Sequence, residues 1–144
     1  MDTIYSTVKD VHSSFRWIVL ALAVAVIVIF AIGWFSKKKF GRLDNTLSLL
    51  YMISCDLQLM LGLTLYFFLS PITQSAIQFG SLQMEDPNVR FFAIEHPITM
   101  ILGIACAHIG RISSKKGLTD SSKFKRGTIW FLLSLILIVS RMPW

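Results

Sequence analysis

Three histidines are the residues of this sequence whose chemistry most needs an explanation, because each lies in or beside a long apolar segment. His12 precedes the first apolar run, His96 lies near the start of the third, and His108 lies nearer its end. An ionisable side chain inside a membrane span costs roughly 2.5–3.5 kcal/mol on insertion scales, so such residues usually mark a site or a structural pairing. We therefore expect the function to depend on what these imidazoles contact.

The start of the third apolar run concentrates polar chemistry, since Glu95, His96 and Pro97 are consecutive. Pro97 has no backbone N–H, so it frees the carbonyl of Ala93 and favours a kink in the helix. Two interpretations of His96 stay open. It is either a functional ligand or a bystander beside a structural Glu95–Arg16 ion pair.

The elements that must position these side chains are membrane helices. The chain has 144 residues, of which 54% are hydrophobic and only 15% charged, whereas soluble domains have about 25% charged residues. Because one span needs about 20 helical residues, four apolar runs and their short loops use the whole length. We expect one all-α integral membrane four-helix bundle over residues 1–144, with spans at about 14–36, 46–69, 90–111 and 126–142.

The basic residues indicate how these spans are oriented. The net charge is +6, and ten of the fourteen Lys and Arg residues lie in the short segments 37–42 and 111–126, which join apolar runs. Short basic loops mark the cytoplasmic side of a membrane. The charge therefore indicates topology, with both termini on the periplasmic side, and we expect no nucleic-acid partner.

Small and polar residues recur along two of the spans. In the second span they repeat every four residues, as Ser54, Gln58, Gly62 and Tyr66. In the third they repeat every seven, as His96, Gly103 and Gly110. Such stripes favour contacts with other helices over contacts with lipid. The external loop, residues 70–88, is long enough to hold a short helix.

The first and third spans run in the same direction, which places His12 and His96 at similar depth near the outer face. Two imidazoles on different helices are the axial ligands that a b-type haem requires, with apolar walls around the macrocycle and cationic groups for its propionates. The cations available on that side are Arg16, Arg90 and Arg141. The alternative for His12 is an interfacial polar residue that caps a helix.

His108 lies at a different depth along the third span from His96. It follows His96 by twelve residues, which is about 18 Å along a helix, so the two cannot ligate one iron. A pair of His108 with Asp56 is geometrically possible, either as a proton relay or as a structural hydrogen bond, and we favour the structural role. A His–Met ligand pair with Met52 or Met60 stays open.

Several short motifs carry a resemblance to a known family. They are His12-Ser-Ser-x-Arg16-Trp17, Gln58-Leu-x-x-Gly62-Leu-x-Leu-Tyr66, Arg90-Phe-Phe-x-x-Glu95-His96, Lys123-Phe-Lys125 and Pro143-Trp144. Over nearly its whole length the chain resembles small four-helix bacterial inner-membrane proteins that are commonly labelled cytochrome b. The resemblance implies haem b as cofactor, His12 and His96 as shared histidines, and a multi-pass location in the inner membrane. That family often has a histidine where this chain has Asp56, so a ligand role there is lost or altered.

These observations leave three hypotheses. The first is a b-type haem protein for electron transfer, with bis-histidine ligation near the periplasmic face and a quinone or another redox partner. The second is a cofactor-free accessory subunit of a larger membrane complex or homo-oligomer, in which the polar stripes serve packing. The third, a proton or small-solute carrier that uses Asp56, His108 and Glu95, is weaker because the sequence shows no inverted repeat.

The sequence contains no motif of a stand-alone enzyme. It has no Gly-rich phosphate loop, no His-x-x-Glu-His zinc motif and no plausible Ser-His-Asp set. We therefore name no catalytic residue and expect an electron-transfer or accessory subunit.

Overall fold

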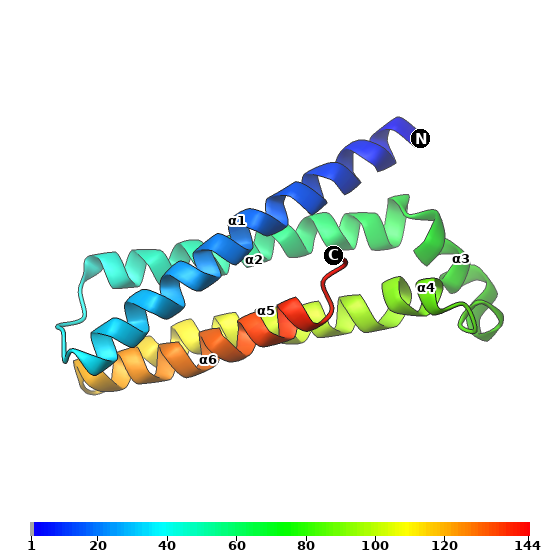
Figure 1. Cartoon of the computed structure of the whole chain (residues 1–144). Helices are drawn as coiled ribbons and strands as arrows, with labels where there is room; N and C mark the ends of the chain where they lie inside the picture. Colours follow the sequence, from blue (N-terminus) through cyan, green and yellow to red (C-terminus); the bar gives the residue numbers. More distant parts are fainter. Residues whose placement is uncertain (1) are drawn as a thin grey trace.

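The computed structural model describes residues 2–144, and over these residues the chain is all-helical, without β-strands. Four long helices make up most of it (Figure 1): α1 (Asp2–Phe35), α2 (Arg42–Thr64), α5 (His96–Lys115) and α6 (Asp120–Ser140). The shorter elements are a π-helix (Leu65–Leu69), α3 (Pro71–Phe79), a 3-10 helix (Gly80–Gln83), α4 (Pro87–Arg90) and a second π-helix (Phe91–Glu95). The predicted all-α fold is confirmed.

Within the described residues 2–144, three helical segments are long and apolar enough to cross a membrane: Thr3–Phe35, Arg42–Leu69 and Pro87–Lys115. They overlap the first three predicted spans, and the first segment ends at Phe35, one residue before the predicted end. Helix α6 is not among them, because the cations Lys123, Lys125 and Arg126 lie within the helix itself. Its uncharged part is therefore confined to residues 127–140.

Two helices begin earlier than the predicted spans. Helix α1 already begins at Asp2, so the polar segment before His12 is a helical extension and not an extended tail. Helix α2 begins at Arg42 after the N-cap Gly41. Asp44 lies in the first turn of this helix. Its carboxylate reaches back to accept from the Gly41 N–H at 2.8 Å and from Lys38 Nζ at 3.1 Å.

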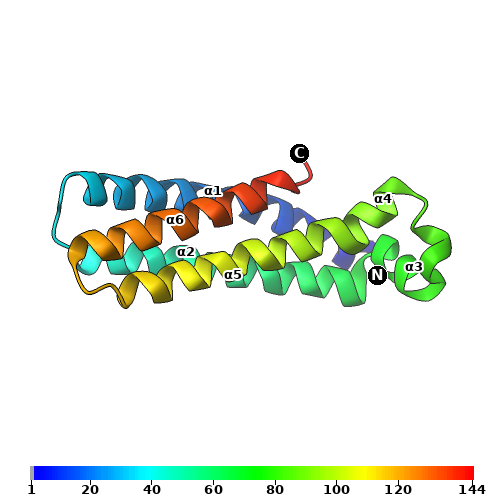
Figure 2. The ribbon, with the colours of Figure 1, turned by 90° about the horizontal axis from the view of Figure 1, so that it is seen from below.

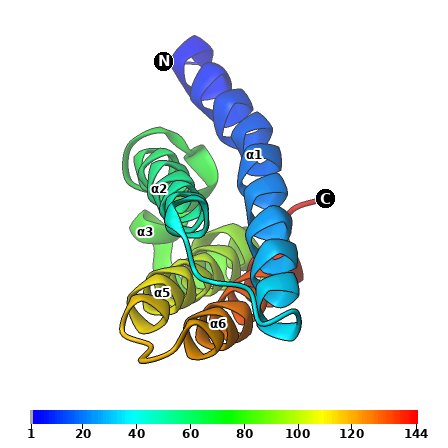
Figure 3. The same ribbon diagram turned by 90° about the vertical axis from the view of Figure 1, so that its left-hand side faces the viewer.

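The four long helices form a ring when viewed along their axes (Figure 3). Helix α1 packs against α2 and α6, and α5 packs against the same two helices from the other side. Phe30 and Phe131 lie in the core with ring centroids 5.3 Å apart. A Cβ at Gly110 would lie 2.8 Å from Phe131, and one at Gly103 would lie 2.9 Å from Ile138. The predicted period-seven stripe of α5 is thus a helix-contact face, and its glycines let α6 pack closely against it.

The two ends of the ring differ (Figures 1 and 2). One end holds the α1–α2 and α5–α6 connections, which carry the basic segments, and the other holds α3 and α4. Both termini lie toward the α3 and α4 end. Helix α3 is the short helix expected in the external loop. It is tied to α2 by Thr73, whose hydroxyl donates to the Tyr66 carbonyl at 2.7 Å.

Candidate functional site

A cavity of about 330 Å³ is lined by residues of all four long helices and of α3. Most of its wall is apolar, including Val19, Leu59, Leu63, Met100, Ile104 and Ile138. Its polar lining includes His12, Arg16, Gln58, Tyr66, Thr73 and His96. An apolar cavity with a few convergent polar groups is the usual form of a small-molecule or cofactor site.

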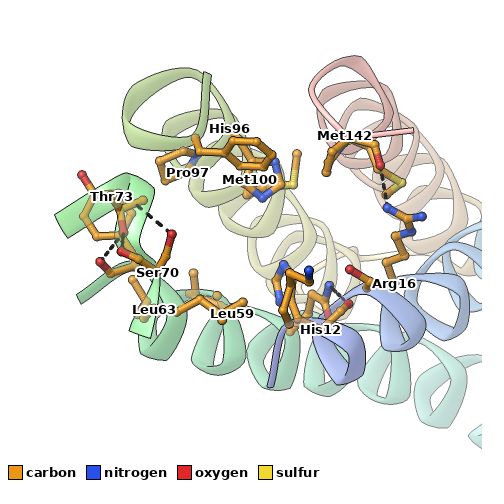
Figure 4. A pocket seen from close by; sticks show the side chains of 18 of the residues that line it. His12, Arg16, Leu59, Leu63, Ser70, Thr73, His96, Pro97, Met100 and Met142 are labelled. Atoms are coloured by element: carbon orange, nitrogen blue, oxygen red, sulfur yellow. Dashed lines mark hydrogen bonds between the residues drawn. The ribbon is translucent and has the colours of Figure 1, made fainter. Parts of the chain in front are cut away.

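The two imidazoles lie across this cavity from each other (Figure 4). The ring centroids of His12 and His96 are 6.4 Å apart, and the ring planes meet at 79°. His12 belongs to α1 and His96 to the first turn of α5. The structure therefore brings together the two histidines that the direction of the predicted spans placed at similar depth.

A backbone carbonyl orients the His96 ring. Its Nδ1 lies 2.8 Å from the carbonyl oxygen of Arg141, after the end of α6. A carbonyl only accepts, so Nδ1 carries the proton and a neutral His96 keeps its lone pair on Nε2. Histidines that bind metals commonly donate their other ring N–H in this way.

Helix α2 holds His12 in place. The side-chain amide of Gln58 donates to the His12 carbonyl at 2.9 Å. A Cβ at position 62 would lie 3.2 Å from Cε1 of the His12 ring, so Gly62 leaves room for the imidazole. Nδ1 of His12 and Oε1 of Gln58 are buried, and neither has a hydrogen-bond partner among residues 2–144. Two members of the period-four stripe of α2, Gln58 and Gly62, thus contact His12 of α1.

The backbone before His96 is irregular, as Pro97 predicts. Residues Phe91–Glu95 form a π-helix that leads directly into α5. The Ala93 carbonyl, which loses its helical donor at Pro97, accepts instead from the Tyr66 hydroxyl at 2.9 Å. This cross-helix bond supports the turn that points His96 into the cavity.

Arg16 lines the cavity, whereas Arg90 and Arg141 pair with Glu95 outside it. Nη1 of Arg16 donates to the Pro143 carbonyl at 2.6 Å, while its buried Nε has no partner in the part of the chain that the structure describes. Glu95 pairs with Arg90 at 3.2 Å and with Arg141 at 3.5 Å. The Glu95–Arg16 ion pair, which the sequence left open as the alternative interpretation of His96, is therefore not formed. Of the three cations considered for propionates, only Arg16 lines the cavity.

Asp56 and His108 form a separate pair outside the cavity. Nε2 of His108 lies 2.7 Å from Oδ1 of Asp56. The hydrogen bond that the sequence left possible is therefore made, between α2 and α5. It joins two side chains that are only partly buried.

The residues that meet at the cavity suit a haem better than a bare metal ion. Among residues 2–144, no three or more His, Cys, Asp or Glu side chains are grouped to hold a metal. Structural zinc needs four protein ligands and catalytic zinc three, whereas a haem macrocycle supplies its own nitrogens and asks for axial ligands only. Two facing imidazoles, apolar walls and one buried guanidinium nitrogen fit that requirement.

Sequence reasoning missed the contribution of the C-terminal segment. The carbonyls of Arg141 and Pro143 hold His96 and Arg16, and Met142 lines the cavity. Backbone carbonyls leave no residue-type signal, so no pattern in the sequence could have identified them. The stripe on α2 did indicate Gln58 and Tyr66 as contact residues, but not their partners.

Comparisons of the chain with protein families, with curated proteins and with solved structures find no match. The function is therefore argued from the geometry of the cavity and from the placement of charge.

Proposed function

We propose that this protein binds one b-type haem between His12 and His96 and takes part in electron transfer across or along a bacterial inner membrane. The observation that carries the proposal is the 6.4 Å distance between the two ring centroids. A metal–imidazole bond of about 2 Å and a ring centre roughly 1 Å behind the nitrogen place two axial rings about 6 Å apart. The two rings are thus spaced as axial ligands of one iron would be.

The chain's own groups supply the rest of such a site. The Arg141 carbonyl fixes the orientation of His96, and most of the cavity lining is apolar. Arg16 offers its unpartnered Nε to one propionate. When bound, the haem would supply one-electron redox chemistry, and the protein would set its potential through ligands, charge and burial.

The proposed membrane arrangement has four spans, with α6 as the fourth and both termini on the periplasmic side. Three segments have the length and hydropathy of spans, and residues 127–140 of α6 continue the same ring beside α1 and α5. The basic segments lie at the end opposite α3 and α4, where the positive-inside rule places the cytoplasm. The cavity is then near the periplasmic face.

A reduced-minus-oxidised visible spectrum of the detergent-purified protein tests the proposal, with a pyridine haemochrome assay for stoichiometry. We expect a sharp α-band and about one haem b per chain. His12→Ala and His96→Ala should lose it, and His108→Ala, which removes a histidine outside the cavity, should keep it. Folded protein that shows no haem after expression with added haem precursor would overturn the proposal.

A second function is favoured by one observation. Segment Arg42–Leu69 is the least buried of the three, with 11% of its apolar window buried against 28% in the other two. An accessory subunit of a larger membrane complex would present such a face to a partner. Haem-free protein that co-purifies with the same membrane subunits in wild type and in His12→Ala would support this alternative.

A further inference from the structure

The Asp56–His108 pair lies on the outer surface of the ring, where helices α2 and α5 run side by side. The side chains of Asp56 and His108 are 41% and 38% exposed. Neighbours on the same helix faces are exposed and apolar, namely Ile53, Met60 and Ile112. Both helices belong to apolar segments that can span a membrane, so the pair is a polar site within a lipid-facing surface.

Each member of the pair keeps one free atom. Among residues 2–144, no group hydrogen-bonds Nδ1 of His108 or Oδ2 of Asp56. A carboxylate only accepts, so a neutral His108 bonded to it carries the proton on Nε2 and presents Nδ1 as an acceptor. With His108 neutral, the pair offers two acceptors side by side, and a group that would satisfy both must donate. Polar groups without partners are costly in the membrane interior, where water is scarce.

We propose that the Asp56–His108 pair binds a hydroxyl of a bilayer-soluble hydroquinone. Such a molecule partitions into lipid, carries its donor on a flat apolar body, and can reach the pair sideways from the membrane. Its oxidised form, a quinone, has only carbonyl acceptors and cannot donate to Nδ1 of His108. The site therefore binds the reduced form more tightly, with Asp56 holding the histidine in the tautomer that accepts.

A hydroquinone is an electron donor that resides in the membrane. Its binding here would therefore supply the electrons for the proposed electron-transfer function, on which this proposal rests. His108 lies on the same helix as His96, about 18 Å further along it at 1.5 Å per residue. The hydroquinone site and the haem site are thus separate places on α5. Variants at one can be examined without altering the other.

The test is photoaffinity labelling in lipid nanodiscs. The probe is a hydroquinone with a diazirine on its alkyl tail, and labelled peptides are identified by mass spectrometry. Competition with unlabelled hydroquinone or with the matching quinone gives the two affinities. We expect saturable labelling of peptides around Asp56 and His108, and about tenfold tighter binding of the reduced form, which is the effect of one hydrogen bond of ordinary strength.

Three variants sharpen the result. His108→Phe keeps a flat ring but removes both nitrogens, and should abolish the preference for the reduced form. In Asp56→Asn the side-chain amide can donate a hydrogen bond to Nε2 of His108, so the histidine can carry its proton on Nδ1 instead. This variant should shift the preference toward the quinone. Thr64→Val changes an exposed α2 residue whose hydroxyl bonds within its own helix, and should leave both affinities unchanged. Circular dichroism and elution profile establish that each variant is folded.

Equal wild-type affinity for the two forms would overturn the inference, as would labelling confined to the His12–His96 cavity. A stable dimer whose interface covers the pair and prevents labelling would also overturn it. His96→Ala separates this inference from the proposed function, because it should lose haem and keep hydroquinone binding. Haem without hydroquinone binding defeats only the inference, and hydroquinone binding without haem defeats only the proposed cofactor.

Discussion

His12 and His96 face each other across one cavity with ring centroids 6.4 Å apart, although they belong to helices α1 and α5. These two helices are not the closest neighbours in the ring, since each packs mainly against α2 and α6. The imidazoles reach across the space that remains between them. Any group bound there would link α1 to α5, so loss of that group should loosen the half of the bundle that holds the cavity.

Gly62→Ala should reduce occupancy of the proposed haem site. Its Cβ would lie 3.2 Å from Cε1 of His12, so the imidazole must shift by a few tenths of an ångström, and axial ligation depends on such positions. We expect the haem-to-protein ratio from the pyridine haemochrome assay to fall by about half or more, as misplaced ligands weaken binding. The control Thr64→Ala, two residues further along α2 from the histidine contact, should retain full occupancy.

Arg16→Gln should lower the midpoint reduction potential of the proposed haem. Arg16 lines the cavity with a buried Nε, and a nearby positive charge favours the reduced, less positive state of the iron. A spectroelectrochemical titration measures the shift. Arg90→Gln is the matched control, because Arg90 bonds Glu95 outside the cavity lining. Equal shifts in both variants would show that Arg16 acts only through the overall charge.

Tyr66→Phe should destabilise the fold. Its hydroxyl is the donor to the Ala93 carbonyl, which Pro97 leaves without a helical partner, and an unpaired buried acceptor costs about 1–3 kcal/mol. Reversible unfolding in mixed micelles gives the change in free energy. Thr64→Val removes a hydroxyl from the same region that bonds only within its own helix. A loss in Tyr66→Phe no larger than in that control would contradict the assigned role.

Ser134→Ala should also lower stability, by about 1–3 kcal/mol, without changing the visible spectrum. The Ser134 hydroxyl donates to the Gly103 carbonyl at 2.6 Å and meets the Tyr51 hydroxyl at 2.8 Å. Its loss leaves buried polar atoms of two other helices without a partner. Ser140→Ala, at an exposed serine of α6, is the control. A spectral change in Ser134→Ala would mean that this bond also positions the cavity.

Glu95→Gln should have a small effect on stability, less than about 1 kcal/mol. The ion pairs of Glu95 with Arg90 and Arg141 are half-exposed, and pairs of this kind contribute little because solvent screens them. His96 is held by the Arg141 carbonyl and not by its guanidinium. Thermal unfolding at two salt concentrations measures the effect. A loss of several kcal/mol would show that the Glu95 pairs anchor the C-terminal segment.

Some contacts could be predicted because they depend on a single helix. The spacing of Gly103 and Gly110 identified the face of α5 that meets α6, and Pro97 identified the freed carbonyl of Ala93. The period-four stripe of α2 likewise marked Gln58 as a contact residue. Helical periodicity and proline chemistry are local properties, so they can be predicted from the sequence alone.

Partner choice could not be predicted in the same way. A Glu95–Arg16 pair was one of the alternatives that the sequence left open. In the structure Glu95 pairs with Arg90 and Arg141, while Arg16 donates to the Pro143 carbonyl. Which arginine a carboxylate meets depends on the rotation of each helix about its own axis. That rotation is set by packing of many side chains at once, and the path of the C-terminal segment adds acceptors that no pattern reveals.

Composition and periodicity act residue by residue, so they were sufficient to predict an all-helical chain with long apolar segments, basic connections and histidines within them. The tertiary structure decided that His12 and His96 share a cavity, that Asp56 and His108 form a pair on its outside, and that Arg16 alone of the expected cations reaches the cavity. These are distances between separate helices. They follow from how the whole ring packs, which no single segment specifies.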